Sequence, residues 1–203
     1  MKSRGYLLTL VVIGVLGVFF LGVFLWGTAV YNSLVSADES ITSAWSQVEN
    51  QYQRRADLIP NLVATVKGVA EHEKEVLQGV TEARARAGQI VVTRDVLADP
   101  QAFARFQAAQ DNLSSALSRL LAVAENYPAI RANENFLTLQ DQLEGTENRI
   151  SIERRRYNEL VQAYNTSIRL FPASLIAGLS GFEERQYFAP TPGSEEVPKV
   201  EFP

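Results

Sequence analysis

The chain begins with one long apolar run and continues as a polar sequence with helical periodicity. From Gly5 to Val30, 26 residues carry no charge. About 20 apolar residues are enough to cross the hydrocarbon core of a bilayer as a helix. We therefore predict a single transmembrane helix over residues 6–30, which would contact the lipid bilayer, preceded by a short basic segment, residues 1–5. Aromatic side chains, which favour the membrane interface, lie near both ends of the run: Tyr6, Trp26 and Tyr31.

The basic residues around this run predict its orientation. Lys2 and Arg4 precede it, and the next basic residue is Arg54. Because Lys and Arg are enriched on the cytoplasmic side, we expect the N-terminus in the cytoplasm and the body across the membrane. A signal peptide cleaved after Thr28-Ala29 is the competing interpretation, but a signal peptide has an apolar region of only roughly 7–15 residues.

After the run, apolar residues recur at steps of three and four, which is typical of one face of a helix. The first series is Ile41, Trp45, Val48 and Tyr52, followed by Ile59, Leu62, Val63, Val66, Ala70, Leu77 and Val80. Pro60 interrupts it and disfavours helical geometry at Ile59. Either the helix kinks at Pro60 or a tight turn separates two helices there.

Two further helices are predicted beyond Gly88. Residues 88–99 form a connection with a β-branched run, and Asp99-Pro100 resembles an N-cap followed by a first-turn proline. The next helix ends at Asn126-Tyr127-Pro128, and the last starts near Asn133 and ends at Phe171-Pro172. Their apolar seams resemble those of packed bundles and coiled coils. The predicted fold is all-α: the transmembrane helix, then an antiparallel up-down bundle of three to four long helices over residues 31–172.

The composition argues against metal and cofactor sites. The chain has no Cys, one His and a net charge of −4. His72 could begin a zinc-protease HExxH motif, but Val76 stands where the second His is required. Without another His or a Cys we expect no metal and no cofactor, and we interpret His72 as part of a solvated helix face.

Carboxylates are frequent but lie at helical spacing beside Lys and Arg, where they support a helix surface. The groups are Asp38/Glu39, Glu71/Glu75, Asp141/Glu144/Glu147, Glu183/Glu184 and Glu195/Glu196. General acid–base catalysis needs two carboxyls held in a cleft with separated pKa values. We assign no catalytic, cofactor-binding or metal-binding residue.

Two charged residues are expected to turn toward the core. Continuing the seam of the last helix from Leu143 by threes and fours reaches Glu147 and Arg154. Burying either one alone would be costly, so each should have a partner on a neighbouring helix. Candidate partners are Arg54, Arg55 and Asp57. A fixed helix register is the favoured interpretation, and a binding site is the alternative.

The basic residues Arg149 and Arg154-Arg155-Arg156 could suggest a nucleic-acid site. Consecutive helix residues point in different directions, however, and the chain is acidic overall. P-loop, GxGxxG and GxSxG motifs are missing from the sequence. We therefore expect no nucleic acid, no small-molecule substrate and no enzymatic activity.

The last part of the chain, residues 173–203, is expected to lie outside the bundle. Its first half is apolar and small, and from Tyr187 it holds too much proline for a core element. It is interpreted either as a terminus that is partly disordered or as a segment that becomes ordered against a partner or another subunit. Under the second interpretation, residues 187–203 mediate assembly.

These residues resemble the LemA family over nearly the whole chain. The segments that carry the resemblance are residues 31–35, 44–49, 53–63, 82–87, 120–123, 125–128, 132–136, 143–150, 156–158 and 171–172, in the family's order. The least similar stretch is the 88–99 connection. The resemblance implies a bacterial single-pass protein of the cytoplasmic (inner) membrane with a helical bundle and no established catalysis. Some relatives have been described with the body in the cytoplasm, which is the alternative to the orientation expected here.

Two functions remain open from the sequence. The first is a non-enzymatic scaffold or adaptor for a membrane partner; the resemblance suggests a membrane quality-control metalloprotease, because the family is associated with such genes. It predicts a large exposed apolar patch on the bundle. The alternative is a structural protein that assembles as a homo-oligomer into a membrane-bound array.

Overall fold

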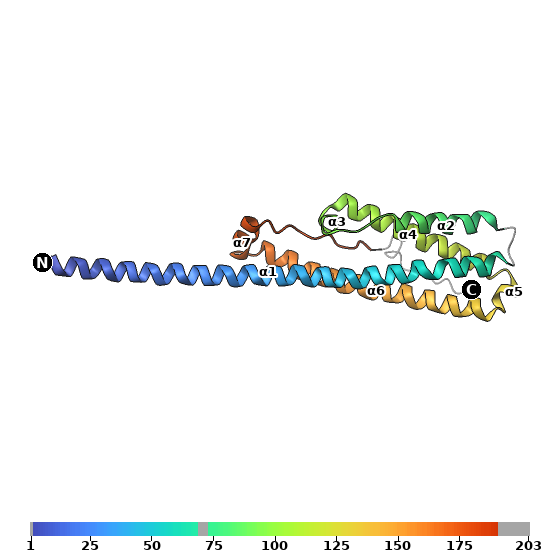
Figure 1. Ribbon diagram of the computed structural model, residues 1–203, viewed down its shortest axis with the longest axis horizontal. Coiled ribbons are helices and arrows are strands. Elements are labelled where there is room, and N and C mark those ends of the chain that lie inside the picture. Colours follow the sequence, from blue (N-terminus) through green and yellow to red (C-terminus); the bar gives the residue numbers. More distant parts are fainter. Residues whose placement is uncertain (1, 69–72, 191–203) are drawn as a thin grey trace, which may run out of the picture. The chain divides into compact units, whose positions relative to one another are not determined.

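The computed structural model describes residues 2–68 and 73–190, with side chains from Leu10 onward. Within these residues the secondary structure is helical and contains no strand, which confirms the all-α prediction. The helices are α1 (Lys2–Lys67), α2 (Lys74–Gly88), α3 (Arg94–Ala98), α4 (Pro100–Ala124), α5 (Pro128–Arg131), α6 (Glu134–Arg169) and α7 (Ala173–Ser180) (Figure 1). The chain forms two compact units. Of the described residues, those up to Ser40 and Gln162–Glu184 belong to unit 1, and those of 41–161 and 185–190 belong to unit 2.

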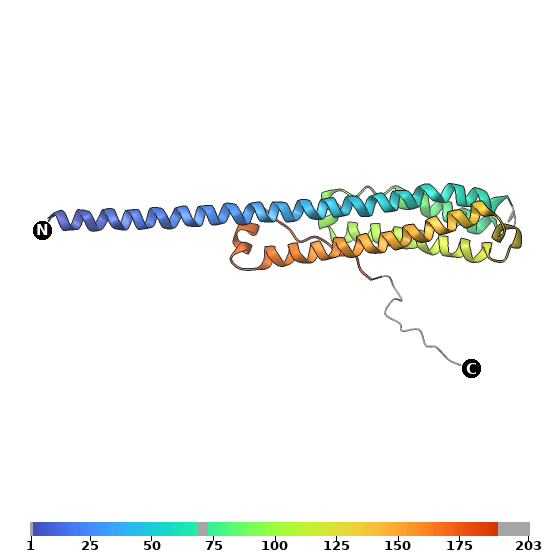
Figure 2. The same cartoon turned by 90° about the horizontal axis from the view of Figure 1, so that it is seen from below.

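Unit 2 is the predicted antiparallel up-down bundle. Its four long helical segments come from α1, α2, α4 and α6, and successive segments run in opposite directions (Figures 1 and 2). All four contribute to one hydrophobic core, in which Leu62 on α1, Val80 on α2 and Leu120 on α4 are fully buried. Phe136 and Leu143 supply the side of α6. The core therefore lies on the helix faces that the three- and four-residue periodicity of the sequence predicts.

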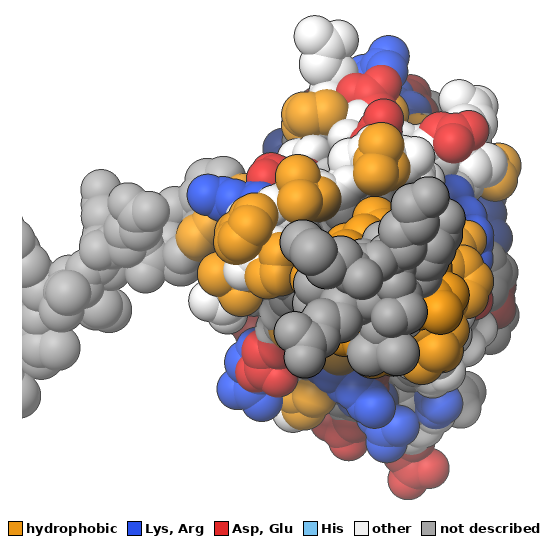
Figure 3. Space-filling view, turned by 90° about the vertical axis from the view of Figure 1, so that its left-hand side faces the viewer, with side chains coloured by type: hydrophobic (Ala, Val, Ile, Leu, Met, Phe, Trp, Pro, Cys, Tyr) orange, Lys and Arg blue, Asp and Glu red, His pale blue; other side chains and the backbone are white. Residues whose placement is uncertain are grey.

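Unit 1 contains the apolar run of α1, the last part of α6, and α7. The large apolar side chains from Leu10 to Trp26 are exposed. Among the described residues, α1 is the helix that is long and apolar enough to cross a membrane. Figure 3 faces the left-hand end of Figure 1, where hydrophobic side chains gather. Helix α7 ends at Ser180 and is capped by Gly181, whose left-handed φ of 73° suits a glycine at this position.

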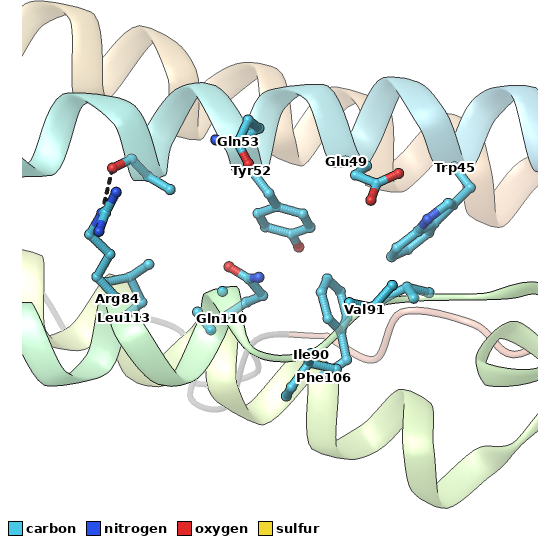
Figure 4. A pocket seen from close by; sticks show the side chains of 14 residues that line it. Trp45, Glu49, Tyr52, Gln53, Arg84, Ile90, Val91, Phe106, Gln110 and Leu113 are labelled. Atoms are coloured by element: carbon cyan, nitrogen blue, oxygen red, sulfur yellow. Dashed lines mark hydrogen bonds between the residues drawn. The ribbon is translucent and has the colours of Figure 1, made fainter.

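Helix α1 continues through Pro60 to Lys67, so the tight turn considered at Pro60 is wrong. A proline at position 60 has no N–H to donate to the carbonyl oxygen of Ala56, one turn earlier. The Arg84 side chain on α2 supplies the missing donor: its Nε lies 2.8 Å from the Ala56 oxygen (Figure 4). Helix α1 therefore continues past Pro60 and ends at Lys67. Residues 69–72, which include Ala70 of the expected apolar series, lie outside the described residues.

The other helix boundaries follow local signals. Asp99 caps α4, because its Oδ1 accepts hydrogen bonds from the N–H groups of Gln101 and Ala102 at 2.8 and 3.1 Å, as the sequence predicts. Asn133 caps α6 in the same way through the N–H groups two and three residues on. The 88–99 connection holds the short helix α3.

Candidate functional site

The centre of the bundle contains a buried arginine with three polar partners. Arg55 of α1 is 1% exposed. Its Nη1 donates to Glu147 Oε1 on α6 at 2.6 Å and to Ser114 Oγ on α4 at 2.7 Å. Its Nη2 donates to Gln110 Oε1 on α4 at 2.6 Å. The predicted pairing of Glu147 with a charged residue of the first helix is confirmed, and Arg55 is the partner.

The environment of Arg55 is aromatic as well as polar. Its guanidinium carbon lies 5.2 Å from the centre of the Tyr52 ring, within range of a cation–π interaction. Burial raises the pKa of Tyr52 to about 12, so its hydroxyl stays protonated at neutral pH. An arginine does not give up its proton in proteins. Neither Arg55 nor Tyr52 can therefore act as a general base. The hydrogen bonds of Arg55 instead connect helices α1, α4 and α6.

Arg154, the second charged residue expected to turn inward, also lies against the bundle. Its Nη1 is 3.8 Å from Asp111 Oδ1 on α4, and its guanidinium carbon is 4.5 Å from the centre of the Phe188 ring. A partner on a neighbouring helix was expected, but Asp111 was not among the candidates. No spacing rule connects residues on two different helices, so the pairing could not be found from the sequence.

An aromatic cluster lies next to this network. Phe188 stacks on Trp45 with ring centres 5.9 Å apart and an interplanar angle of 15°. It also contacts Phe103 at 5.0 Å and Tyr157 at 5.4 Å. Phe188 is 5% exposed, although the sequence interpretation had excluded a core role for the chain beyond Tyr187. That exclusion is wrong at Phe188, because a single large ring can fill a core site without belonging to a helix.

Two side-chain amides hold the extended backbone around Phe188. Asn158 on α6 accepts from the Phe188 N–H at 2.9 Å and donates to the Phe188 oxygen at 3.0 Å. Gln107 on α4 does the same with Ala189, at 3.1 and 3.0 Å. Each amide replaces one residue of a neighbouring strand, so the segment is hydrogen-bonded as in a sheet. The remaining residues of the proposed assembly segment, 191–203, lie outside the described residues.

A pocket of about 170 Å³ opens between α1, α2, α4 and the residues after Gly88. Figure 4 shows Trp45 and Tyr52 projecting from α1 toward Phe106 and Gln110 of α4. Within the described part of the chain, the Trp45 Nε1 and the Tyr52 hydroxyl are buried without a hydrogen-bond partner. The residues that line the pocket are mainly apolar, and these two polar atoms are shielded from solvent.

Of the other residues considered in the sequence, some lie outside the described part of the chain and others lie at its surface. His72 and Glu71 lie outside the described residues, as do Glu195 and Glu196. In the part of the chain that is described, no three His, Cys, Asp or Glu side chains are grouped as metal ligands. Arg149, Arg155 and Arg156 are exposed. Glu184 lies 3.7 Å from Arg169 at the surface.

Comparison with known proteins matches residues 44–202 to the LemA family. The chain belongs to the LemA family. The matched region covers the bundle, the arginine network and Phe188. The chain is 28% identical to Magnetosome protein MamQ 1 and to Magnetosome protein MamQ 2 of Paramagnetospirillum magneticum over 181 residues, 81% of this chain and 66% of each relative. It is 23% identical to Protein LemA of Metamycoplasma hominis over 146 residues, 72% of this chain and 63% of that protein. This LemA-family chain therefore spans slightly less than two thirds of the length of these relatives.

Proposed function

We propose that this LemA-family protein is a non-enzymatic scaffold or adaptor, anchored in the bacterial cytoplasmic membrane through residues 6–30, that binds a membrane partner. The observation that carries the proposal is helix α1, which bears both the exposed apolar run and the first helix of the bundle. A folded bundle is thereby kept beside the bilayer. The orientation follows from Lys2 and Arg4: the N-terminus lies in the cytoplasm and the bundle in the periplasm or outside.

The use of polar groups within the bundle supports a binding role over catalysis. Arg55, Glu147 and Arg154, the charged residues that turn inward, all contact other parts of the bundle. Tyr52 remains neutral. These groups set the register of the helices and leave the outer surface for interactions. The partner suggested by the family resemblance is a membrane quality-control metalloprotease.

The apolar surface of the bundle is dispersed, which constrains how a partner binds. In the described part of unit 2, the exposed large apolar side chains are Val91, Leu137, Ile152 and Tyr187. They come from the 88–93 connection, α6 and the segment after α7. The single large apolar patch expected for an adaptor does not emerge from these residues, so we expect a mostly polar, mixed interface.

The test is site-specific photo-crosslinking in native membranes. A photoreactive residue is placed at Val91, Leu137 or Ile152, and the full chain is then purified in mild detergent with particle mass and crosslinked partners determined together. Leu16, in the apolar run, is the control for lipid-facing positions. The adaptor proposal expects one protein, in fixed stoichiometry, crosslinked from the bundle positions and not from position 16.

Two results would overturn the adaptor role. Crosslinks only between copies of this chain, with a large homo-oligomeric particle, would favour the structural array. Crosslinks to no protein at any bundle position, with a monomeric particle, would contradict both functions.

A further inference from the structure

Helix α7 and the residues just before it present a group of apolar side chains that their own unit does not cover. Phe171 is 80% exposed and Leu179 87% exposed, and Leu170 and Leu175 are more than half exposed. The stretch from Leu170 to Phe182 contains no charged residue. Scattered exposed apolar residues are ordinary, but four within ten positions form a patch of the kind that marks an interaction surface.

The two faces of α7 are used differently. Leu175 and Leu179 are four residues apart and so lie on one face of the helix. Ala177, which lies on the opposite face, is 3% exposed. The side chain of Ile176 reaches α1, where its Cδ1 is 3.7 Å from the position of a Cβ at Gly27. The inner face of α7 is therefore packed, and the leucine face is left open.

Contacts within unit 1 place α7 at one end of the apolar run of α1. Besides the contact at Gly27, the Phe182 ring lies 5.7 Å from the Tyr31 ring. Gly27 and Tyr31 are one helical turn apart, at the point where the apolar run ends and Asn32 and Ser33 follow. A run of 26 helical residues is about 39 Å long, whereas the hydrocarbon core is about 30 Å thick. The last turn of the run therefore lies at the membrane interface, and α7 lies beside it.

We propose that α7 is a second membrane contact, with Phe171, Leu175 and Leu179 inserted into the headgroup–acyl boundary beside α1. The proposal rests on the membrane anchor proposed above. Short apolar helix faces lie in this zone, about 5–10 Å deep. The occupant is lipid because α7 contacts the end of the apolar run of α1, whose own exposed apolar side chains require lipid. Arg169 and Glu184, which flank the stretch and lie 3.7 Å apart, would lie at headgroup level.

Such a contact would fix more than the depth of the chain. The length of a single transmembrane helix fixes neither its tilt nor its rotation about its own axis. A second contact beside the first fixes the rotation of α1 about its axis and limits its tilt. Unit 1 would then present a defined side to any partner in the membrane.

The chain contains no Cys, so single cysteines can be introduced for labelling without removing any. The full chain carrying Leu179→Cys is labelled with an environment-sensitive fluorophore and reconstituted into phosphatidylcholine–phosphatidylglycerol vesicles. Quenching is measured with nitroxide lipids that carry the nitroxide near the headgroup or near the bilayer centre, and with aqueous iodide. Leu16→Cys, near the middle of the apolar run, reports on the anchor. Val91→Cys, an apolar but exposed position of the bundle, reports on water.

The expected result is a blue-shifted emission at position 179, quenched most by the shallow nitroxide and little by iodide. Position 16 should be quenched most by the deep nitroxide, and position 91 by iodide. Iodide quenching at 179 equal to that at 91, with position 16 still lipid-quenched, would overturn the α7 contact and leave the anchor intact. Protection of 179 from both lipid and aqueous quenchers would also overturn it, because protein would then cover α7. Loss of lipid quenching at position 16 would contradict the anchor itself.

Discussion

A single side chain from another helix completes the hydrogen bonding of α1 at Pro60. Arg84 Nε donates to the Ala56 oxygen, which a residue with an N–H at position 60 would otherwise satisfy. Substitution Arg84→Met should lower the free energy of unfolding by about 1–3 kcal/mol, because it leaves a partly buried acceptor unpaired. In a Pro60→Ala background the same substitution should cost clearly less, since the helix then supplies the donor. Thermal unfolding of the four variants in mild detergent measures the coupling.

Arg86 on the same helix is the matched control for Arg84. It is exposed and pairs with Glu82, at 3.3 Å across one turn. Arg86→Met should therefore change the stability by less than about 0.5 kcal/mol. Equal losses for Arg84→Met with and without Pro60 would show that Arg84 acts independently of the proline.

Tyr52 has a buried hydroxyl that finds no partner among the described residues. Removing it in Tyr52→Phe should raise the free energy of unfolding at pH 7 by about 1 kcal/mol, while the ring keeps its contact with Arg55. The pKa of Tyr52 is raised from 10.0 to about 12 in the folded protein. Between these two values the unfolded chain loses a proton that the folded chain retains, so the stability falls as pH rises.

Denaturant unfolding of the wild type and of Tyr52→Phe, compared from pH 7 to pH 12, tests both effects. The gap between the two proteins should widen above pH 10 in favour of the variant. A variant that is less stable than the wild type at pH 7 would show that the hydroxyl is hydrogen-bonded after all.

The extended segment after α7 behaves as a further packing element of the bundle. Phe188 fills the aromatic cluster, and the amides of Asn158 and Gln107 hold its backbone. Phe188→Ala should lower the free energy of unfolding by about 3–5 kcal/mol, as for other large-to-small changes in a core. The neighbouring Tyr187 is 45% exposed, so Tyr187→Ala should cost much less. Similar melting temperatures for the two variants would contradict the core role of Phe188.

The contrast between these elements shows what the sequence could predict. The starts of α4 and α6 were predicted from the sequence, because each depends on neighbouring residues: Asp99 caps α4 and Asn133 caps α6. The inward position of Glu147 was predicted from the regular seam of the last helix, and Arg55 was one of the three candidate partners named for it. The bond from Arg84 to Ala56 and the burial of Phe188 depend on residues brought together only by the folded chain. Neither periodicity nor composition contains that information.

At the scale of the whole molecule, α1 and α6 each contribute to both units. Unit 1 holds the apolar run and α7, and unit 2 holds the arginine network and the aromatic cluster. Surface apolar residues gather in unit 1 and are dispersed in unit 2. The membrane-facing and the water-facing chemistry of the chain are thus divided between the two units, which agrees with a bundle held at a bilayer.

The orientation of the chain can be decided with the same cysteine-free background. In intact bacterial cells, Val91→Cys should react with a membrane-impermeant maleimide, because the orientation proposed from Lys2 and Arg4 places the bundle outside the inner membrane. For a Gram-negative host, the outer membrane is first made permeable to the reagent. A cysteine at Ser3 should react only after the inner membrane is disrupted, and Leu16→Cys should react poorly in both conditions.

Adding Lys residues after position 31 should weaken the preference for this orientation, since the difference in positive charge across the apolar run sets it. Labelling of Ser3→Cys but not of Val91→Cys in intact cells would reverse the orientation and place the bundle, with any partner it binds, in the cytoplasm.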